Sequence, residues 1–194
     1  MNIIKSLNIS TFNEFLVDNA KHKNIAKIYR QIAFACKIIS NKIRRASLEG
    51  LCGETSLTNT HGEQVKTLDI ISNDLFITSL KKINDIYCMI SEENYDIINC
   101  NKNGKYIVTF DPLDGSSNIN CNVSIGSIFG IYERSNSLDD NLCNGQDLIS
   151  SGYCLYGTST TMVIALNDCV NGFTLDENYG EFILTHHNMK ITNG

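Results

Sequence analysis

The only proline of this 194-residue chain, Pro112, stands between two aspartates in the stretch FDPLDGSSN, residues 110–118. The apolar run YIVTF at 106–110, which leads into it, is typical of a buried strand. Proline fixes its own φ and pushes the preceding residue toward an extended conformation. The sequence therefore predicts a strand that breaks directly after Asp111 and a turn that presents Asp111 and Asp114 together.

The residues that follow the turn favour anion binding. Gly115 lets the backbone bend tightly, and the N–H groups near Ser116 and Ser117 would form an anion-binding concavity, with two hydroxyls in support.

A second strand-like run, IYCMI at 86–90, also ends in acids, at Glu92 and Glu93. Ligands of α/β sheets bind beyond the carboxyl ends of strands. If the runs 86–90 and 106–110 are neighbours, their acids meet in one cleft, where mutual repulsion raises the pKa values and favours a hard cation such as Mg²⁺. Cations beside an anion nest are what phosphate-ester hydrolysis requires. Taken alone, the Asp-Pro-x-Asp-Gly string fits an ordinary turn at least as well, and a Glu pair fits solvated surface.

The rest of the chain predicts a mixed α/β architecture, with helices mainly first and a sheet after. Helical periodicity runs from Phe12 to Arg45. A mobile loop rich in Gly, Ser and Thr is expected at 50–62, and a second helix at 64–82. That helix should turn inward Val65, Leu68, Ile71 and Leu75. Further predicted elements are a strand at 122–133, a surface loop at 134–148, buried runs YCLYG and MVIAL, and a hairpin at 172–184 with its turn near 177–180.

Composition limits the function classes. Apolar residues make up 42% of the chain, which is enough for a core, and the net charge of −5 argues against a general nucleic-acid binder. No apolar run reaches membrane-spanning length and no signal peptide is visible, so we expect a cytoplasmic protein that binds no membrane. The eight cysteines are scattered without a C-x-x-C motif, which indicates free thiols in a reducing compartment.

Several of these motifs together resemble class I fructose-1,6-bisphosphatase. They are SEEN at 91–94, FDPLDGSSNI at 110–119, SIGSIFGIY at 124–132, HGEQVKTLDIISNDL at 61–75 and GFTLDENYGEFIL at 172–184. The likeness runs in order over most of the chain from about Ala35 onward. Inositol monophosphatases share the acid-Pro-x-Asp-Gly core but usually follow it with Thr-Thr or Ser-Thr. The resemblance implies an α/β fold, the layered helix–sheet sandwich of the inositol monophosphatase-like sugar-phosphatase superfamily.

The resemblance also implies an activity. The family are phosphoric monoester hydrolases that remove the 1-phosphate of fructose 1,6-bisphosphate to give fructose 6-phosphate in gluconeogenesis. They use two to three ions of Mg²⁺ (or Mn²⁺ or Zn²⁺) per site and are usually homotetramers. Two alternatives stay open: another sugar or inositol phosphatase of the superfamily, and a catalytically inactive truncated relative.

Residue roles carry over by motif. The implied metal ligands are Glu63, Glu92, Asp111, the Leu113 carbonyl and Asp114. Asp69 and Glu93 would help activate the attacking water. The 1-phosphate would be held by Asp114, Gly115, Ser116 and Ser117. The family has Asp where this chain has Glu63, whose longer side chain keeps the charge.

Two departures from the family pattern change the expectations. Residues 1–194 correspond to the N-terminal domain, and nothing in them matches the family's C-terminal sugar-binding domain, so we expect impaired activity. The family's AMP site is degraded: Lys105 and Tyr106 match it, but Glu133 replaces an Arg and HKNIA at 22–26 replaces a Thr-rich segment. We therefore expect weak AMP inhibition.

Overall fold

A computed structural model describes residues 10–19, 23–51, 53–58, 64–134 and 144–191. The helices are α1 Phe12–Asn19, α2 Lys23–Arg44, α3 Ala46–Glu49 and α4 Thr67–Leu80, with short 3₁₀ turns η2 at Ser116–Cys121 and η3 at Gly145–Asp147. The strands are β1 Glu54–Thr58, β2 Gln64–Lys66, β3 Ile86–Ser91, β4 Ile98–Asn99, β5 Tyr106–Asp114, β6 Ile125–Glu133, β7 Leu148–Tyr156, β8 Thr160–Leu166, β9 Cys169–Asp176 and β10 Glu181–His186.

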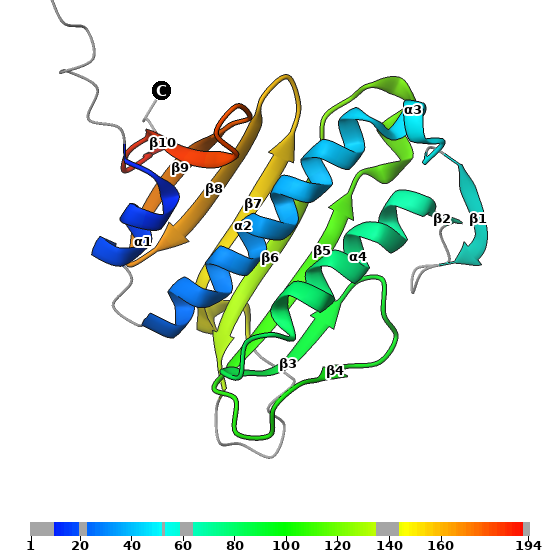
Figure 1. Cartoon of the computed structure of the whole chain (residues 1–194). Coiled ribbons are helices and arrows are strands. Elements are labelled where there is room, and N and C mark those ends of the chain that lie inside the picture. The colour runs from blue at the N-terminus through cyan, green and yellow to red at the C-terminus, as the bar shows by residue number, and fades with distance from the viewer. Residues whose placement is uncertain (1–9, 20–22, 52, 59–63, 135–143, 192–194) are drawn as a thin grey trace, which may run out of the picture.

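Eight strands form one sheet in the order β10-β9-β8-β7-β6-β5-β3-β4. Among the strands that the structure describes in this sheet, β3 and β5 are parallel neighbours and the other pairs are antiparallel. Helices α1, α2 and α4 cover one face of this sheet (Figure 1). The expected layered α/β arrangement, with most helices before the sheet, is confirmed.

The core lies between these helices and the sheet. Tyr29 of α2 meets Phe129 of β6 edge-on, with ring centroids 6.0 Å apart, and Phe76 of α4 stacks on Phe110 of β5 at 5.0 Å. On the opposite face of the sheet, strands β6 and β7 present three large apolar side chains that are more than 40% exposed, namely Ile128, Tyr153 and Leu155. One face of the sheet is thus covered by helices, whereas the other exposes apolar side chains on β6 and β7.

The expected single helical segment from Phe12 to Arg45 is two helices, and the residues between them lie outside the described part of the chain. A capping box starts α1: the Thr11 N–H donates to Glu14 Oε2 (2.8 Å), and the Glu14 N–H donates to Thr11 Oγ1 (3.2 Å). Phe12 then packs against Phe173, with centroids 4.9 Å apart. The physical reason for two helices is that α1 buries its apolar side under the β9–β10 end of the sheet, whereas α2 packs over its centre.

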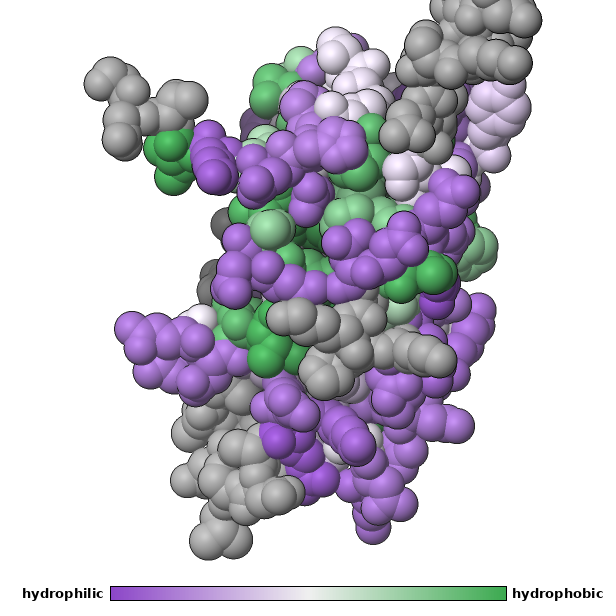
Figure 2. Space-filling view, turned by 90° about the vertical axis from the view of Figure 1, so that its left-hand side faces the viewer, coloured by the Kyte–Doolittle hydropathy of each residue, from purple (hydrophilic) through white to green (hydrophobic). Residues whose placement is uncertain are grey.

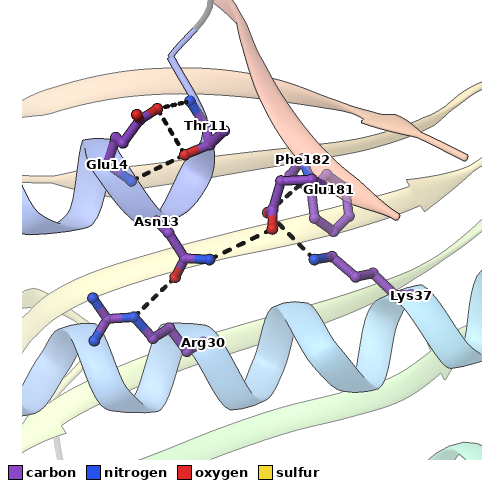
Figure 3. A network of polar contacts seen from close by, with 7 residues as sticks. All are labelled: Thr11, Asn13, Glu14, Arg30, Lys37, Glu181 and Phe182. Atoms are coloured by element: carbon purple, nitrogen blue, oxygen red, sulfur yellow. Dashed lines mark hydrogen bonds and ion pairs between the residues drawn. The ribbon is translucent and has the colours of Figure 1, made fainter. Parts of the chain in front are cut away.

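Polar contacts fasten α1 to its neighbours (Figure 3). Asn13 accepts from Arg30 Nε of α2 at 2.9 Å and donates to Glu181 of β10 at 3.5 Å. Lys37 also reaches Glu181, at 3.3 Å. Figure 2 looks at this side of the molecule and shows its apolar residues in separate small areas among polar ones.

The predicted mobile loop at 50–62 is wrong in part, because Glu54–Thr58 and Gln64–Lys66 pair as a two-stranded antiparallel sheet. Residues 59–63 lie outside the described chain. A backbone ladder needs no apolar side chains, so a Ser- and Thr-rich composition does not exclude it. Since β2 takes residues 64–66, α4 begins at Thr67 rather than at Gln64.

The inward residues of α4 differ in part from those expected. Leu68 is buried as predicted, Ile71 and Leu75 are half-buried, and Phe76 and Leu80 complete the packed side. The side chain of Val65 lies outside the description.

Two further sequence expectations, on α2 and on residues 172–184, are confirmed. The buried residues of α2 follow the predicted stripe, and β9 and β10 form the predicted hairpin. In YCLYG, Cys154 and Tyr156 are buried, but Tyr153 and Leu155 point to the open face. Of the predicted loop at 134–148, residues 135–143 are not described.

No disulfide joins the described cysteines, and among the described helices none has the length and apolar character that crossing a bilayer requires.

Candidate active site

The two strands that end in acids are neighbours, which meets the condition on which the predicted cleft depended. β3 and β5 run parallel, with Ser91 beside Phe110, and the Glu92 N–H donates to the Phe110 carbonyl at 3.1 Å. Glu92 therefore lies at the same sheet edge as Asp111, the residue after Phe110. Glu93 follows, with its N–H on Ser91 Oγ at 3.3 Å.

The strand does not break after Asp111 as predicted, but continues to Asp114 through a β-bulge. Asp111 pairs with Ile128 and Asp114 with Gly126, so Pro112 and Leu113 together oppose only Ser127. A bulge suits proline because the extra residue needs no ladder bond from its missing N–H. In a regular strand, residues three apart point to opposite faces. The extra residue corrects this, and the two aspartates share one face.

Local hydrogen bonds hold the bulge. The Leu113 N–H donates to Asp111 Oδ1 at 3.0 Å, and Ser127 Oγ donates to the Pro112 carbonyl at 2.7 Å. Gly115 then adopts φ +78°, a left-handed conformation that favours glycine, and directs the chain into η2. The N–H groups of Ser116 and Ser117 stand at the start of this turn, whose first bond joins the Asn118 N–H to the Gly115 carbonyl at 2.9 Å.

The surroundings of Asp111 raise its pKa and so disfavour its ionised form. The pKa of Asp111 is raised to about 6, first by burial and then by the charge of Glu92, with Asp114 and Asp69 adding smaller contributions. The hydrogen bond from Leu113 partly offsets this. A carboxyl that is disfavoured as an anion by burial and neighbouring acids is stabilised by a cation.

The described acids do not form a closed metal cage. No group of three or more His, Cys, Asp or Glu side chains is gathered at ligating distance among the residues for which the structure gives positions. Glu63, the remaining acid implied by the resemblance, lies outside them.

The first turn of α4 brings Asp69 to the same edge. Asp69 is buried, and its Oδ2 accepts from the Lys66 N–H at 2.7 Å, which caps the helix. Lys66, also buried, was not singled out from the sequence. Its ammonium donates to the Ser116 carbonyl at 2.8 Å and so places a positive charge beside the predicted anion nest. A lysine just before a helix resembles an ordinary surface residue, and only its burial reveals the contact.

Lys105 and Tyr106 lie at the other end of β5, far along the strand from Asp111. Tyr106 pairs with Glu133, and burial raises its pKa, with Glu133 and Asp85 adding to the shift. The guanidinium of the next residue, Arg134, lies 3.8 Å from the centroid of the Tyr87 ring and donates to the Lys102 carbonyl at 3.0 Å.

Comparisons with known proteins agree on one family. The family described as "Fructose-1-6-bisphosphatase, N-terminal domain" matches residues 10–187. The chain is 39% identical to a fructose-1,6-bisphosphatase of Schizosaccharomyces pombe, over 94% of the chain and 59% of that protein. It is 46% identical to a cytosolic fructose-1,6-bisphosphatase of Solanum tuberosum, over 82% of the chain and 49% of that protein.

A solved structure agrees as well. The crystal structure of the Leishmania major fructose-1,6-bisphosphatase in holo form superposes with a TM-score of 0.87 at 35% identity, covering 94% of this chain and 60% of that one. The chain thus spans about half to three fifths of the length of the proteins it matches. The match of the family to residues 10–187, at these identities and with this fold, shows that the chain belongs to the fructose-1,6-bisphosphatase family.

Proposed function

We propose that the chain carries the metal- and phosphate-binding part of a phosphatase site that hydrolyses the 1-phosphate of fructose 1,6-bisphosphate to fructose 6-phosphate and phosphate. The single observation that carries the proposal is the β5 bulge, which puts Asp111 and Asp114 on one face beside Glu92. Holding like charges together at the end of two strands costs free energy, and a bound cation would offset that cost. The role in gluconeogenesis and the cytoplasmic location rest on the family alone.

The donor set fits a hard divalent cation, Mg²⁺ or in its place Mn²⁺ or Zn²⁺. Glu92, Asp111, Asp114 and the Leu113 carbonyl offer oxygen ligands only, which is the set that Mg²⁺ prefers. Burial and the neighbouring acids raise the pKa of Asp111 to about 6, and a bound cation would offset that cost. When bound, two to three such ions would supply positive charge to the phosphoryl oxygens and lower the pKa of water.

The remaining residues would orient the reactants. Asp69 is fixed by its capping bond before any ligand arrives, so it is suited, with Glu93, to orient the attacking water and accept its proton. Ser116 and Ser117 would donate N–H and O–H groups to the 1-phosphate. Lys66 adds a cation behind this nest through its bond to the Ser116 carbonyl.

The chain corresponds, in this proposal, to the N-terminal domain of the longer relatives. The open sheet face with Ile128, Tyr153 and Leu155 is the surface on which the rest of such a protein would pack. That further part would supply the residues that bind the sugar and the 6-phosphate. We expect oligomers like the family's tetramers only when it is present. Because positioning is worth on the order of 7–11 kcal/mol, residues 1–194 alone should turn over very slowly.

The test is an assay of residues 1–194 with saturating Mg²⁺, with and without the C-terminal part of the potato relative supplied in trans. Fructose 1,6-bisphosphate and inositol monophosphate are compared as substrates. We expect phosphate release from the first to rise by about 10³-fold or more in the reconstituted sample, because each ~1.4 kcal/mol of recovered positioning is tenfold. Asp111→Asn in the reconstituted sample is the inactive control.

Three results would count against the proposal. Equal rates on both substrates would favour a broader phosphatase. No metal binding by the wild-type chain would favour an inactive relative. Full turnover without the C-terminal part of the potato relative would show that residues 1–194 themselves bind the sugar and the 6-phosphate.

A further inference from the structure

A hydrogen-bond chain that no motif points to lies directly behind the bulge. Ser127 is fully buried on β6, and its Oγ is 2.7 Å from the Pro112 carbonyl and 2.7 Å from the Tyr156 hydroxyl. A carbonyl only accepts, so the single Ser127 proton goes to Pro112, and Tyr156 must donate to Ser127. We call this Tyr156–Ser127–Pro112 chain the bulge clamp.

The clamp acts at the one point where the β5–β6 ladder is interrupted. Two residues of β5 face one of β6 there, so the ladder leaves one backbone group of the bulge without its usual partner. Ser127 supplies the missing donor to the Pro112 carbonyl from its side chain. The bulged register is thereby satisfied at a buried position, where an unmet carbonyl is costly.

The competing register shows what the clamp prevents. Continuing the regular ladder from the Asp111–Ile128 pair would place Asp114 opposite Ile125 instead of Gly126. Ile125 is buried on the helix-covered face, so Asp114 would turn toward the core and away from Asp111. The clamp therefore favours the register in which the two aspartates face the same way.

A second chain of the same chemistry lies elsewhere in the sheet. The Tyr29 hydroxyl bonds Ser150 Oγ, which donates to the Ala165 carbonyl at 2.5 Å. Tyr29 and Ser150 are both buried, but Ala165 belongs to β8, whose pairing with β7 is regular and carries no acids of the candidate site. This chain separates the effect of losing a buried hydroxyl from the effect of losing the clamp.

We propose that Ser127, supported by Tyr156, is a positioning residue that sets the direction of the Asp111 and Asp114 carboxylates and so determines the affinity for a divalent cation. The cation part of this inference rests on the proposed function. The register part does not, because it concerns only how β5 pairs with β6.

The experiment compares four variants of the full 194-residue chain with the wild type: Ser127→Ala, Ser127→Thr, Tyr156→Phe and Ser150→Ala. Calorimetry with Mn²⁺ measures affinity, and thermal unfolding measures stability. Ser127→Ala should weaken Mn²⁺ binding about 10-fold or more, the scale known for groups that orient ligands. Ser127→Thr, which keeps the hydroxyl, should bind within about threefold of wild type, and Tyr156→Phe should fall between. Ser150→Ala should lose stability but keep its affinity.

Nuclear Overhauser contacts between Asp114 and Gly126 report the register without any metal. We expect them to weaken in Ser127→Ala and to persist in Ser127→Thr and Ser150→Ala. If wild type binds no Mn²⁺, the proposed function fails, and the contacts alone decide on the clamp. Unchanged contacts in a folded Ser127→Ala protein, or an equal loss of Mn²⁺ affinity in Ser150→Ala, would overturn the inference.

Discussion

The two ends of strand β5 have opposite surroundings. At the carboxyl end, Asp111 and Asp114 share a face beside Glu92, and their like charges help to raise the pKa of Asp111. At the amino end, near Tyr106, the acid Asp85 is engaged within the chain, since it accepts from Asn24 at 3.0 Å and pairs with Lys27 at 3.4 Å.

This difference distinguishes a candidate ligand site from a region whose charges are already paired. Charges of one sign that are held together cost free energy, which a bound cation recovers. Charges that already have partners of opposite sign gain little from a ligand, and an added anion would meet Glu133. The same strand therefore offers a candidate metal site at one end, whereas the acid beside its other end, Asp85, is already paired with Lys27 and Asn24.

The largest expected effect is on metal affinity. Asp111→Asn removes one charge with little change of shape, and Mn²⁺ or Mg²⁺ affinity should fall about 10- to 100-fold. The matched control is Asp85→Asn at the other end of the strand, which should bind within about twofold of wild type. Calorimetric titration of both variants checks this, and similar losses in both would abolish the distinction between the two ends.

The next effect is on stability without metal. The pKa of Asp111 rises from 3.8 to about 6 on folding, so the folded chain holds more protons and stability should fall as pH rises between those values. Because Asp111 is partly exposed, screening limits the change to about 1 kcal/mol, or about 2–4 °C in Tm. Thermal unfolding with EDTA at pH 4 and 7.5 should show this pH dependence in wild type and less of it in Asp111→Asn. An identical pH dependence in both would mean that Asp111 ionises without cost.

The smallest effect concerns AMP. We expect the wild-type chain to bind AMP with a Kd above about 1 mM, and Glu133→Arg to strengthen binding only about threefold, because exposed charge pairs contribute less than about 1 kcal/mol. Asp74→Arg, an equal charge change on the exposed side of α4, is the control. Micromolar binding by the wild type, seen by calorimetry, would show that the amino end of β5 is a ligand site after all.

Local patterns were enough to predict several parts of the molecule. The stripe on α2, the β9–β10 hairpin and the acids at the ends of β3 and β5 all follow from residue spacing within one segment. That β3 and β5 are neighbours was only a condition of the predicted cleft, because acids at two strand ends do not by themselves fix the strand order. The family likeness rested in part on the same stretches, namely residues 91–94, 110–119 and 172–184.

Features that depend on two segments could not be predicted. The bulge is a property of how β5 pairs with β6, and nothing in DPLDG alone distinguishes a bulge from a break. Ser127 resembles any small strand residue, and Lys66 any surface lysine, until their partners are known. The pattern T-x-x-E at residues 11–14 is a sequence signal for the capping box that starts α1. The helical periodicity continues across residues 12–45, however, so it does not show that α1 and α2 are separate helices.

The bulge has a consequence for anyone who would transplant this turn into another sheet. In a regular strand, two aspartates three positions apart would point to opposite faces. The bulge places them on one face, and Ser127 on β6 and Tyr156 on β7 stabilise it through hydrogen bonds. Grafted alone beside a strand without a buried hydroxyl at that position, DPLDG would be free to take the regular pairing and turn its second acid inward. The functional module is therefore three strands wide, and its minimal portable form includes residues that lie more than forty positions apart in the chain.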